Sequence, residues 1–346
     1  MSKQGKRIRL GVVGMGSRGG MFAAVAQAVG GAELVGVCES DPTRRERAAR
    51  QFGVPGFADT AALCAETAPD AVVVATPDFA HREPAVAAAK AGCHLMIEKP
   101  LAMTDEDARA IAGAVAASGV QAMVAFENHW NPVAAGMKAA ADAGELGELI
   151  CCTSQLDDRI DVPTKLIPWL KDSGPGWFLA AHAVELATWV SGQKPTRVWA
   201  QGHRGVLEKL GAGTWDALHA VINFDGGMVG SFTSNFVQPK SLPVVYQFRQ
   251  EYVGTAGAVR LDATDQALHK ATDTYQHPTT IGVPVGGGTP LSSPPAQMLI
   301  AFIDALAAGE PVPCPIEDGL LNVAVLIAIH ESARRGEAME VGHPSR

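Results

Sequence analysis

The stretch "RIRLGVVGMGSRGG" at residues 7–20 decides the fold class. An apolar run passes into the pattern Gly14-x-Gly16-x-x-Gly19, and an alanine-rich helical pattern follows. In a strand–loop–helix unit the first glycine makes a tight turn, the second lets the backbone approach a pyrophosphate, and the third allows close packing of helix and strand. Phosphates bind at the helix N-terminus. The stretch therefore predicts a dinucleotide-binding parallel sheet.

An acidic residue follows at the distance that this pattern requires. Glu39 stands twenty residues past Gly19, at the end of the second apolar run, where a carboxylate would hold the adenosine ribose hydroxyls. Its charge would repel a 2'-phosphate, which favours NAD over NADP, although Arg44 and Arg45 leave NADP open. Two further residues of the glycine loop are expected beside the cofactor: Ser17 and Arg18.

The rest of the chain divides into two parts with different patterns. Up to about residue 125, short apolar strands alternate with helical patterns, which predicts βαβ units and a doubly covered parallel sheet. Residues 1–127 are thus expected to form a dinucleotide-binding Rossmann domain. Residues 128–346 are expected to form an α+β domain with a large, mainly antiparallel open sheet, which binds substrate and forms oligomers. Its expected parts are an irregular stretch at 157–176, strands between 196 and 275, and helices at 294–308 and 317–335.

Composition narrows the class of protein. A chain of 346 residues favours two domains, and a formal net charge of -8 argues against nucleic acid or an anionic membrane surface as partner. The six cysteines form no CxxC pair, which fits a reducing compartment. The first residues lack the features of a signal peptide, and no apolar run has the length of a membrane span. A cytoplasmic location is therefore expected.

A lysine follows another predicted strand of the first domain. In "HLMIEKPLAMT" (94–104) the strand ends at Glu98-Lys99-Pro100. Ligands of open parallel sheets bind beyond the carboxyl ends of the strands, so Lys99 is expected to point toward the nicotinamide half of a dinucleotide. A half-buried lysine there could carry the proton of an alcohol that gives up hydride. The alternative is an ordinary surface lysine at a strand end.

With these residues in place, the sequence resembles the Gfo/Idh/MocA family of glucose–fructose oxidoreductases and inositol dehydrogenases. The resemblance covers nearly the whole chain. It rests on "GVVGMGSRG" with Glu39, "ATPDFAH" (75–81), "EKPLAMT" (98–104), "ENHWNP" (127–132), "GELGELI" (144–150), His182 and "FIDALAAGEPVPCPIEDGL" (302–320).

The resemblance implies roles for individual residues. Lys99 would be the catalytic lysine, and His182 would be the histidine that works with it. Glu98 would lie with Lys99 against the nicotinamide ribose, and Asn128 would lie at the domain junction. Three residues of "ATPDFAH" would line the cofactor site: Thr76, Pro77 and His81.

One position departs from the family pattern. Family dehydrogenases typically carry an aspartate four residues before the histidine, on the same helical face, and this chain has Phe178 there. Glu185, three residues after His182, could orient the imidazole or take part of the aspartate's role. The acids of the irregular stretch that precedes them are further candidates: Asp157, Asp158 and Asp161. The sequence does not distinguish among them, and His182 alone on an apolar helix could also be a core residue.

Aromatic residues surround the predicted substrate site. Trp169 and Trp177 flank the irregular stretch, where indole faces could bury the apolar face of a sugar or cyclitol; Trp130 and Trp189 are alternatives, and any of the four could be core. The expected substrate-binding residues are Lys99, Trp169, Trp177, Phe178, His182 and Glu185. No metal site is expected, since no histidine pair has ligand spacing.

Three functions are open at this stage. The first is NAD-dependent oxidation of a secondary alcohol of a small polyhydroxylated substrate: a sugar, cyclitol or glycoside. The second is a glycosidase or epimerase that keeps its NAD and returns the hydride in each turnover, which Phe178 favours. The third is a dinucleotide-binding sensor without chemistry, against which the presence of Lys99 and His182 argues. The resemblance also implies a homodimer or homotetramer.

Overall fold

The computed structural model describes residues 7–265, 270–273, 275–276 and 291–342. The internal contacts divide the chain into two compact units. The first comprises residues 1–127 and 282–320, and the second comprises residues 128–281 and 321–346.

The first unit is built on a six-stranded parallel sheet, as the sequence predicted. The strand order is β3-β2-β1-β4-β5-β6, so the order reverses between β1 and β4. In open sheets of this kind a ligand binds beyond the carboxyl ends of the strands at such a reversal. The strands are β1 (Ile8–Val13), β2 (Ala32–Cys38), β3 (Gly56–Phe57), β4 (Ala71–Val74), β5 (His94–Ile97) and β6 (Ala122–Val124).

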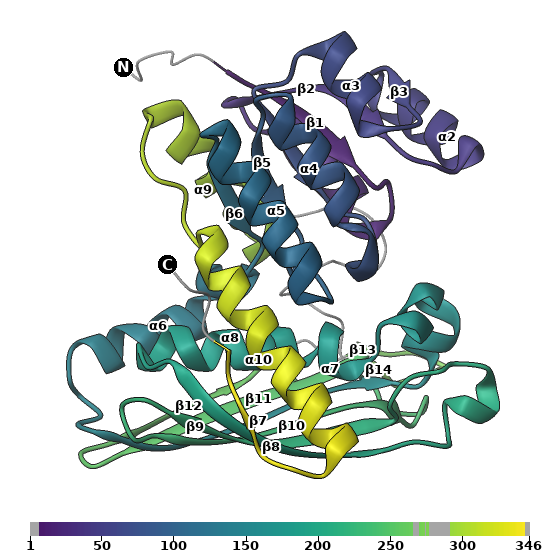
Figure 1. Ribbon diagram of the computed structural model, residues 1–346. Coiled ribbons are helices and arrows are strands. Elements are labelled where there is room, and N and C mark those ends of the chain that lie inside the picture. Colours follow the sequence, from purple (N-terminus) through teal and green to yellow (C-terminus); the bar gives the residue numbers. More distant parts are fainter. Residues whose placement is uncertain (1–6, 266–269, 274, 277–290, 343–346) are drawn as a thin grey trace. The chain divides into compact units, whose positions relative to one another are not determined.

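Helices cover both faces of this sheet (Figure 1). Helix α1 packs with α2 and α9, whereas α3, α4 and α5 pack in a row; right-handed crossovers place the two groups on opposite faces. The helices are α1 (Ser17–Ala28), α2 (Pro42–Phe52), α3 (Thr60–Thr67), α4 (Arg82–Lys90), α5 (Asp105–Ser118) and α9 (Pro294–Ala308).

The position of α9 corrects one domain assignment. Residues 294–308 were expected in the second domain, but α9 packs on α1 and β1 of the first unit. A Cβ at Gly31 would lie 3.2 Å from Cγ2 of Ile303, so the glycine leaves room for this contact. Leu299 and Phe302 are fully buried. The face of the sheet beside α1 is therefore covered by a segment distant in sequence.

The second unit contains a seven-stranded sheet in the order β12-β11-β7-β10-β9-β8-β15. Strands β7 and β10 are parallel and the other neighbours are antiparallel, which confirms the predicted mainly antiparallel sheet. The strands are β7 (Leu149–Arg159), β8 (Pro195–His203), β9 (Ala217–Phe224), β10 (Val229–Gln238), β11 (Tyr246–Gly254), β12 (Ala258–Asp262) and β15 (Met339–Glu340). A separate short pair consists of β13 (Lys270–Ala271) and β14 (Tyr275–Gln276).

In the part of the second unit that the structure describes, the helices lie on one face of this sheet (Figure 1). The longer ones are α6 (Pro132–Asp142), α8 (Ala180–Ser191) and α10 (Ile316–Arg335). Burial follows the side-chain alternation of the strands: in β9, Leu218, Ala220 and Ile222 are buried while the residues between them are exposed. Helix α10 belongs to the first unit up to Leu320 and to the second from there on.

The stretch 157–176 is more regular than the sequence analysis expected. Strand β7 continues to Arg159, and three short helical segments follow it: a π-helical turn (Val162–Leu166), a 3₁₀ helix (Pro168–Asp172) and α7 (Pro175–Phe178). Each begins with a proline in its first turn, where the missing N–H and fixed φ of proline favour helical starts.

Candidate active site

The three glycines of the loop after β1 meet different constraints. Gly14 has φ +87°, and a Cβ there would lie 2.6 Å from the Ala75 carbonyl oxygen. A Cβ at Gly19 would lie 1.8 Å from the Gly14 carbonyl oxygen. At Gly16, in contrast, a Cβ would meet no atom within 4 Å. The fold itself thus requires Gly14 and Gly19, whereas Gly16 borders open space.

The start of α1 fits the pyrophosphate of a dinucleotide. Gly16 is the N-cap and supplies no side-chain cap, and the first turn has no acidic residue. The first N–H groups of a helix have no partner within the helix and attract anions. Ser17 is exposed beside them. This loop has the open space and the donors that a phosphate group needs.

Glu39 joins the glycine loop to the next helix. The carboxylate is buried, and it accepts hydrogen bonds from the backbone N–H groups of Met15 and Asp41, both at 3.0 Å. Arg44 is one of the two arginines that could accommodate the 2'-phosphate of NADP. Its Nη2 forms an ion pair with Oε1 of Glu39 at 3.5 Å. Arg45 donates to the Glu39 carbonyl oxygen at 2.9 Å. Both arginines thus have Glu39 as a partner.

The buried side chain of His81 connects the loops that follow β4 and β5 through hydrogen bonds. Nδ1 of His81 lies 2.9 Å from the Pro100 carbonyl oxygen, and Nε2 lies 3.0 Å from that of Thr76. The Thr76 hydroxyl donates to the Ala80 carbonyl oxygen at 2.9 Å, and Pro77 precedes the 3₁₀ helix Asp78–Ala80. These residues hold the two loops at the carboxyl edge of the sheet.

Lys99 and Glu98 are buried at this edge. Lys99 is 3% exposed, and burial lowers the pKa of its ammonium group, while the charge of Asp78 opposes this reduction. Burial likewise raises the pKa of Glu98, and the charge of Arg18 opposes it. A lysine with a lowered pKa can release its proton more readily than a surface lysine. Lys99 is therefore not the ordinary surface residue of the alternative interpretation.

Asp78 was not among the residues proposed from sequence. It lies in the quoted "ATPDFAH" stretch, between residues that were selected, and it is buried. The neighbouring Phe79 is exposed. The acidic residue is thus buried and the apolar residue exposed, which is the reverse of what the hydropathy of the sequence would predict. The only available signal was that an acid follows β4 one strand away from the lysine that follows β5.

Arg18 connects the glycine loop to two further strand ends. Its Nε lies 3.4 Å from Oε1 of Glu98, and its guanidinium also pairs with Glu127, which follows β6. The cofactor residues proposed within the first unit thus gather around the carboxyl ends of β1, β2, β4 and β5. Asn128, the first residue of the second unit, is partly exposed in the 3₁₀ helix Glu127–Trp130.

In the second unit His182 belongs to a stripe along one helical side. His182, Glu185 and Trp189 follow each other in α8 at spacings of three and four residues, which places them on one side of the helix. Phe178 is the last residue of α7 and precedes His182 by four residues. Phe178, His182 and Trp189 are partly exposed, whereas Glu185 is buried. We call these four residues the α8 stripe.

Glu185 has a partner that the sequence analysis did not consider for this role. Nε2 of His129 donates to Oε1 of Glu185 at 2.6 Å. The His129 ring also stacks on Trp189, with centroids 3.9 Å apart and an interplanar angle of 13°. His129 thus covers the C-terminal half of the α8 stripe.

The aromatic residues separate into two groups. Trp169 meets Phe178 edge to face at 5.9 Å, and Phe178 in turn contacts the buried Phe236 at 6.2 Å. Trp177 is only 8% exposed, and its indole stacks on His330 of α10 at 4.6 Å. We therefore assign Trp177 to core packing and leave it out of the proposed substrate site.

Donors from other elements hold the backbone of α8. Asn322 of α10 donates to the Ala181 carbonyl oxygen at 3.1 Å, and Gln250 of β11 donates to that of Ala183 at 3.1 Å. The hydroxyl of Tyr252, also in β11, donates to the Leu186 carbonyl oxygen at 3.2 Å. All three side chains are buried. They fix the rotation of α8 and hence the direction of its stripe.

Two of the candidate acids near β7 have other partners. Asp157 accepts hydrogen bonds from the side chains of Gln155 and Gln238, and burial raises the pKa of its carboxyl. Asp161 forms an ion pair with Arg159. Asp158 is buried.

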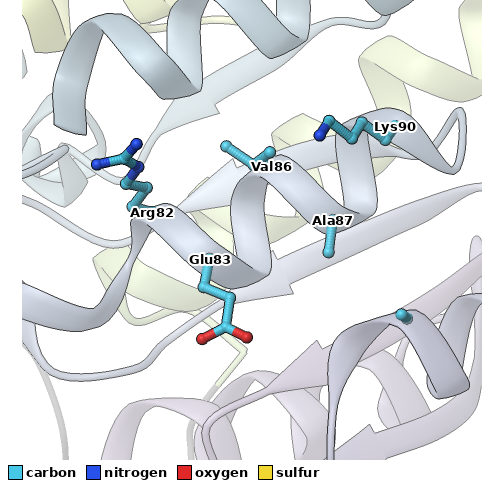
Figure 2. A pocket seen from close by; sticks show the side chains of 6 residues that line it. Arg82, Glu83, Val86, Ala87 and Lys90 are labelled. Carbon is cyan, nitrogen blue, oxygen red and sulfur yellow. The ribbon is translucent and has the colours of Figure 1, made fainter. Parts of the chain in front are cut away.

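A groove outside this region runs along α4 and is shown in Figure 2. Arg82 and Lys90 mark its two ends on α4, and Ala61 of α3 contributes to its wall. It contains none of the residues proposed from the sequence. Within the described ranges, no group of three or more His, Cys, Asp or Glu side chains is placed to hold a metal ion, and no helix has the length and apolarity to cross a membrane.

Comparison with known proteins identifies the family. Residues 8–126 match the model of the Gfo/Idh/MocA oxidoreductases, described as an NAD-binding Rossmann fold, and residues 135–260 match the model of their C-terminal domain. The chain belongs to the Gfo/Idh/MocA family. The resemblance proposed from the sequence is thereby confirmed.

Individual members of the Gfo/Idh/MocA family show the range of named activities. A scyllo-inositol 2-dehydrogenase (NAD(+)) of Bacillus subtilis is 30% identical over 262 residues, 73% of each chain. A 2,7-anhydro-N-acetylneuraminate hydratase of Escherichia coli is 28% identical over 75% of this chain and 69% of its own. The structure of a scyllo-inositol dehydrogenase from Lactobacillus casei, with NAD(H) and scyllo-inositol bound, matches this structure with a TM-score of 0.82. The two sequences are 20% identical, and the match covers 97% of this chain and 99% of that one. At this identity the match supports the fold alone.

Proposed function

We propose that the protein is an NAD-dependent oxidoreductase that oxidises a secondary alcohol of a sugar, cyclitol or glycoside by hydride transfer. The observation that carries the proposal is the buried Lys99, with its lowered pKa, in the unit that holds the glycine loop. A dinucleotide-binding protein without chemistry has no need for such a lysine.

The cofactor supplies the hydride acceptor when it is bound. The chain's own residues hold it and handle the proton. The proposed cofactor-binding residues are Gly14, Gly16, Ser17, Arg18, Gly19, Glu39, Thr76, Pro77, His81, Glu98, Lys99 and Asn128.

We propose Lys99 and His182 as the catalytic residues. In its neutral form Lys99 can accept the hydroxyl proton as hydrogen leaves the carbinol carbon. The partly exposed imidazole of His182 can bind the same class of hydroxyl and carry a proton. The proposed substrate-binding residues are Lys99, Trp169, Phe178, His182 and Glu185.

A second candidate is a glycosidase or epimerase that retains NAD and returns the hydride in each turnover. Two observations support this second candidate. Phe178 stands in place of the family aspartate, and the Escherichia coli relative is named a hydratase. Phenylalanine cannot accept a proton, so the acid–base chemistry around His182 differs from that of the typical dehydrogenase.

One experiment distinguishes these functions. The purified protein is incubated with NAD and a panel of inositols, sugars and glycosides, and NADH absorbance and product mass are followed in the same samples. NADH that rises together with a product two hydrogens lighter supports the dehydrogenase. Product that needs NAD but forms without net NADH supports the second candidate, and absence of product with every compound contradicts both.

A matched pair of variants tests Lys99. We expect Lys99→Met to reduce turnover by about 10²- to 10⁴-fold, the usual contribution of general acid–base catalysis. Lys90→Met, at an exposed lysine of α4, should leave turnover unchanged. Equal turnover of both variants would contradict the assignment of Lys99.

We further propose a cytoplasmic homodimer or homotetramer. All six cysteines are free thiols, which fits a reducing compartment. The face of the seven-stranded sheet opposite α8 exposes Trp199, Val221, Val229 and Val253, and apolar side chains gathered on an uncovered sheet favour contact with another protein surface. A second copy of the chain is the partner that we propose for this face.

A further inference from the structure

The two halves of the α8 stripe have opposite chemical character. At its C-terminal half, the Glu185 carboxylate and the His129 ring form a hydrogen-bonded pair closed off by Trp189. At its N-terminal half, Phe178 is partly exposed and meets the partly exposed Trp169 edge to face. His182 lies between a polar half and an aromatic half.

The aromatic half is a fixed surface. Phe178 rests on Phe236, which is fully buried in β10, and the edge-to-face contact with Trp169 is a preferred geometry of aromatic pairs. Phe178 ends α7 and His182 lies in the first turn of α8, so only the connection at Leu179 separates the two elements that carry them.

A ring with hydroxyls on every carbon gains less from this surface than an apolar group does. Its C–H face can pack on an aromatic ring, but hydroxyls directed at the Phe178 ring would lose hydrogen bonds to water without gaining partners from that ring. Two of the acids of the segment before α7 already have partners: Asp161 pairs with Arg159, and Asp157 accepts from Gln155 and Gln238. An apolar group, in contrast, gains contact area and aromatic packing.

We infer that the substrate class is a glycoside with an apolar aglycone, whose sugar hydroxyls face His182 while the aglycone packs on Phe178 and Trp169. The inference rests on the proposed function, of which it specifies the substrate. It also gives Phe178 a role in specificity.

The test compares phenyl glycosides with the corresponding methyl glycosides, in both anomers of D-glucose and D-galactose, with myo-inositol as the fully hydroxylated reference. NADH, released phenol and product mass are all measured, so oxidation and cleavage are both detected. We expect kcat/KM to be at least about tenfold higher for the preferred phenyl glycoside than for its methyl partner, the range of one good aromatic contact together with its buried area.

Variants locate the effect. Trp169→Ala and Phe178→Asp should each bring the phenyl-to-methyl ratio close to one, and Phe178→Asp should favour the more hydroxylated compound. Trp215→Ala removes a partly exposed indole that lies under Arg204, outside the stripe, and should retain the wild-type ratio.

The outcomes separate the inference from the proposed function. Turnover with equal kcat/KM for phenyl and methyl glycosides, or a preference for myo-inositol, overturns the inference and leaves the oxidoreductase in place. A wild-type ratio in both stripe variants also overturns it. No turnover with any compound contradicts the proposed function and the inference with it.

Discussion

Gly14, Gly16 and Gly19 are glycines for different physical reasons. A side chain at Gly14 or Gly19 would collide with backbone of the same unit, whereas a Cβ at Gly16 would meet nothing. The folded chain therefore places no steric constraint on a Cβ at Gly16, and we propose that the pyrophosphate of the cofactor takes this space.

This difference gives a prediction for Gly16→Ala. We expect the variant to bind NAD at least about tenfold more weakly, because the methyl group occupies the space through which phosphate oxygens approach the N–H groups of α1. The free energy of unfolding should fall by no more than about 1 kcal/mol, the cost of alanine at an N-cap. Calorimetric titration with NAD and thermal unfolding measure the two effects.

Gly113→Ala is the matched control. Gly113 is an exposed glycine within α5, and a Cβ there meets no atom within 4 Å. It should bind NAD normally and gain about 0.5–1 kcal/mol from helix propensity. Normal NAD affinity in Gly16→Ala would contradict the phosphate role of the loop.

Asp78 leads to a second prediction at this scale. Its negative charge raises the pKa of Lys99 against the effect of burial. Asp78→Asn should lower the pKa of Lys99 further, so the acid limb of the kcat/KM profile should move to lower pH, by about one unit for a close charge. Oxidation rates between pH 5 and 10 measure this shift.

Asp105→Asn is the control for the charge itself. Asp105 is exposed in the first turn of α5, where it pairs with Arg109. The acid limb of this variant should coincide with that of the wild type. A limb that stays in place in Asp78→Asn as well would show that Asp78 does not set the ionisation of Lys99.

At the scale of elements, local patterns predicted most of the fold. The parallel sheet followed from alternating strands and helices, and α9 was predicted with its observed bounds because its apolar residues recur at helical spacing. The same pattern could not say where α9 packs. That depends on space beside Gly31, which no periodicity reveals.

For the candidate site, too, the sequence predicted the residues that follow strands but not those whose roles depend on tertiary contacts. Gly14, Glu39 and Lys99 follow strands directly, so topology alone brings them to one edge of the sheet. The charge of Asp78 beside Lys99 and the pairing of His129 with Glu185 were not predicted, because each depends on a tertiary partner: a buried lysine for one and a carboxylate on α8 for the other. The choice between core and substrate site for Trp177 was open for the same reason, since only the fold brings His330 against it.

The anchoring of α8 gives a prediction for Tyr252→Phe. Loss of the hydroxyl removes its bond to the Leu186 carbonyl and leaves Gln250 with one acceptor fewer. We expect a loss of about 1–2 kcal/mol in the free energy of unfolding, typical of a buried hydrogen bond. Urea denaturation measures it. Tyr275→Phe, at an exposed tyrosine, should change stability by less than about 0.5 kcal/mol, and an equal loss in both variants would contradict the anchoring role.

At the scale of the whole molecule, His330 makes stability depend on pH. Burial lowers the pKa of His330 from 6.5 to about 4. Between these values the unfolded chain binds a proton that the folded chain does not, so acidification favours unfolding. The free energy of unfolding should fall as the pH drops from 6.5 toward 4, by up to about 3 kcal/mol from this residue.

Paired variants isolate this contribution from the titration of carboxylates. His330→Gln should flatten the dependence of stability on pH between 6.5 and 4, measured by urea denaturation at each pH. His219→Gln, at an exposed histidine of β9, should retain the wild-type slope. Identical slopes in all three proteins would exclude His330 as the source.

The uncovered sheet face gives a prediction about assembly. Trp199 is 46% exposed on that face, and Trp199→Asp would place a charge within a proposed apolar contact. We expect the variant to sediment as a smaller species than the wild type with unchanged circular dichroism. A wild-type protein that sediments as a monomer, or a variant of unchanged mass, would contradict self-association through this face.

The return of residues 282–320 to the first unit has a consequence for biosynthesis. A ribosome completes every strand of the nucleotide-binding sheet long before it reaches α9, so the area beside α1 that α9 covers stays exposed while the whole second sheet is translated. Domains that are continuous in sequence can fold as soon as they emerge, but this one lacks one of its covering helices until α9 is made. Gene fragments that end near residue 127 should therefore yield aggregated product, and separate expression of the nucleotide-binding half requires α9 to be supplied through a short engineered linker.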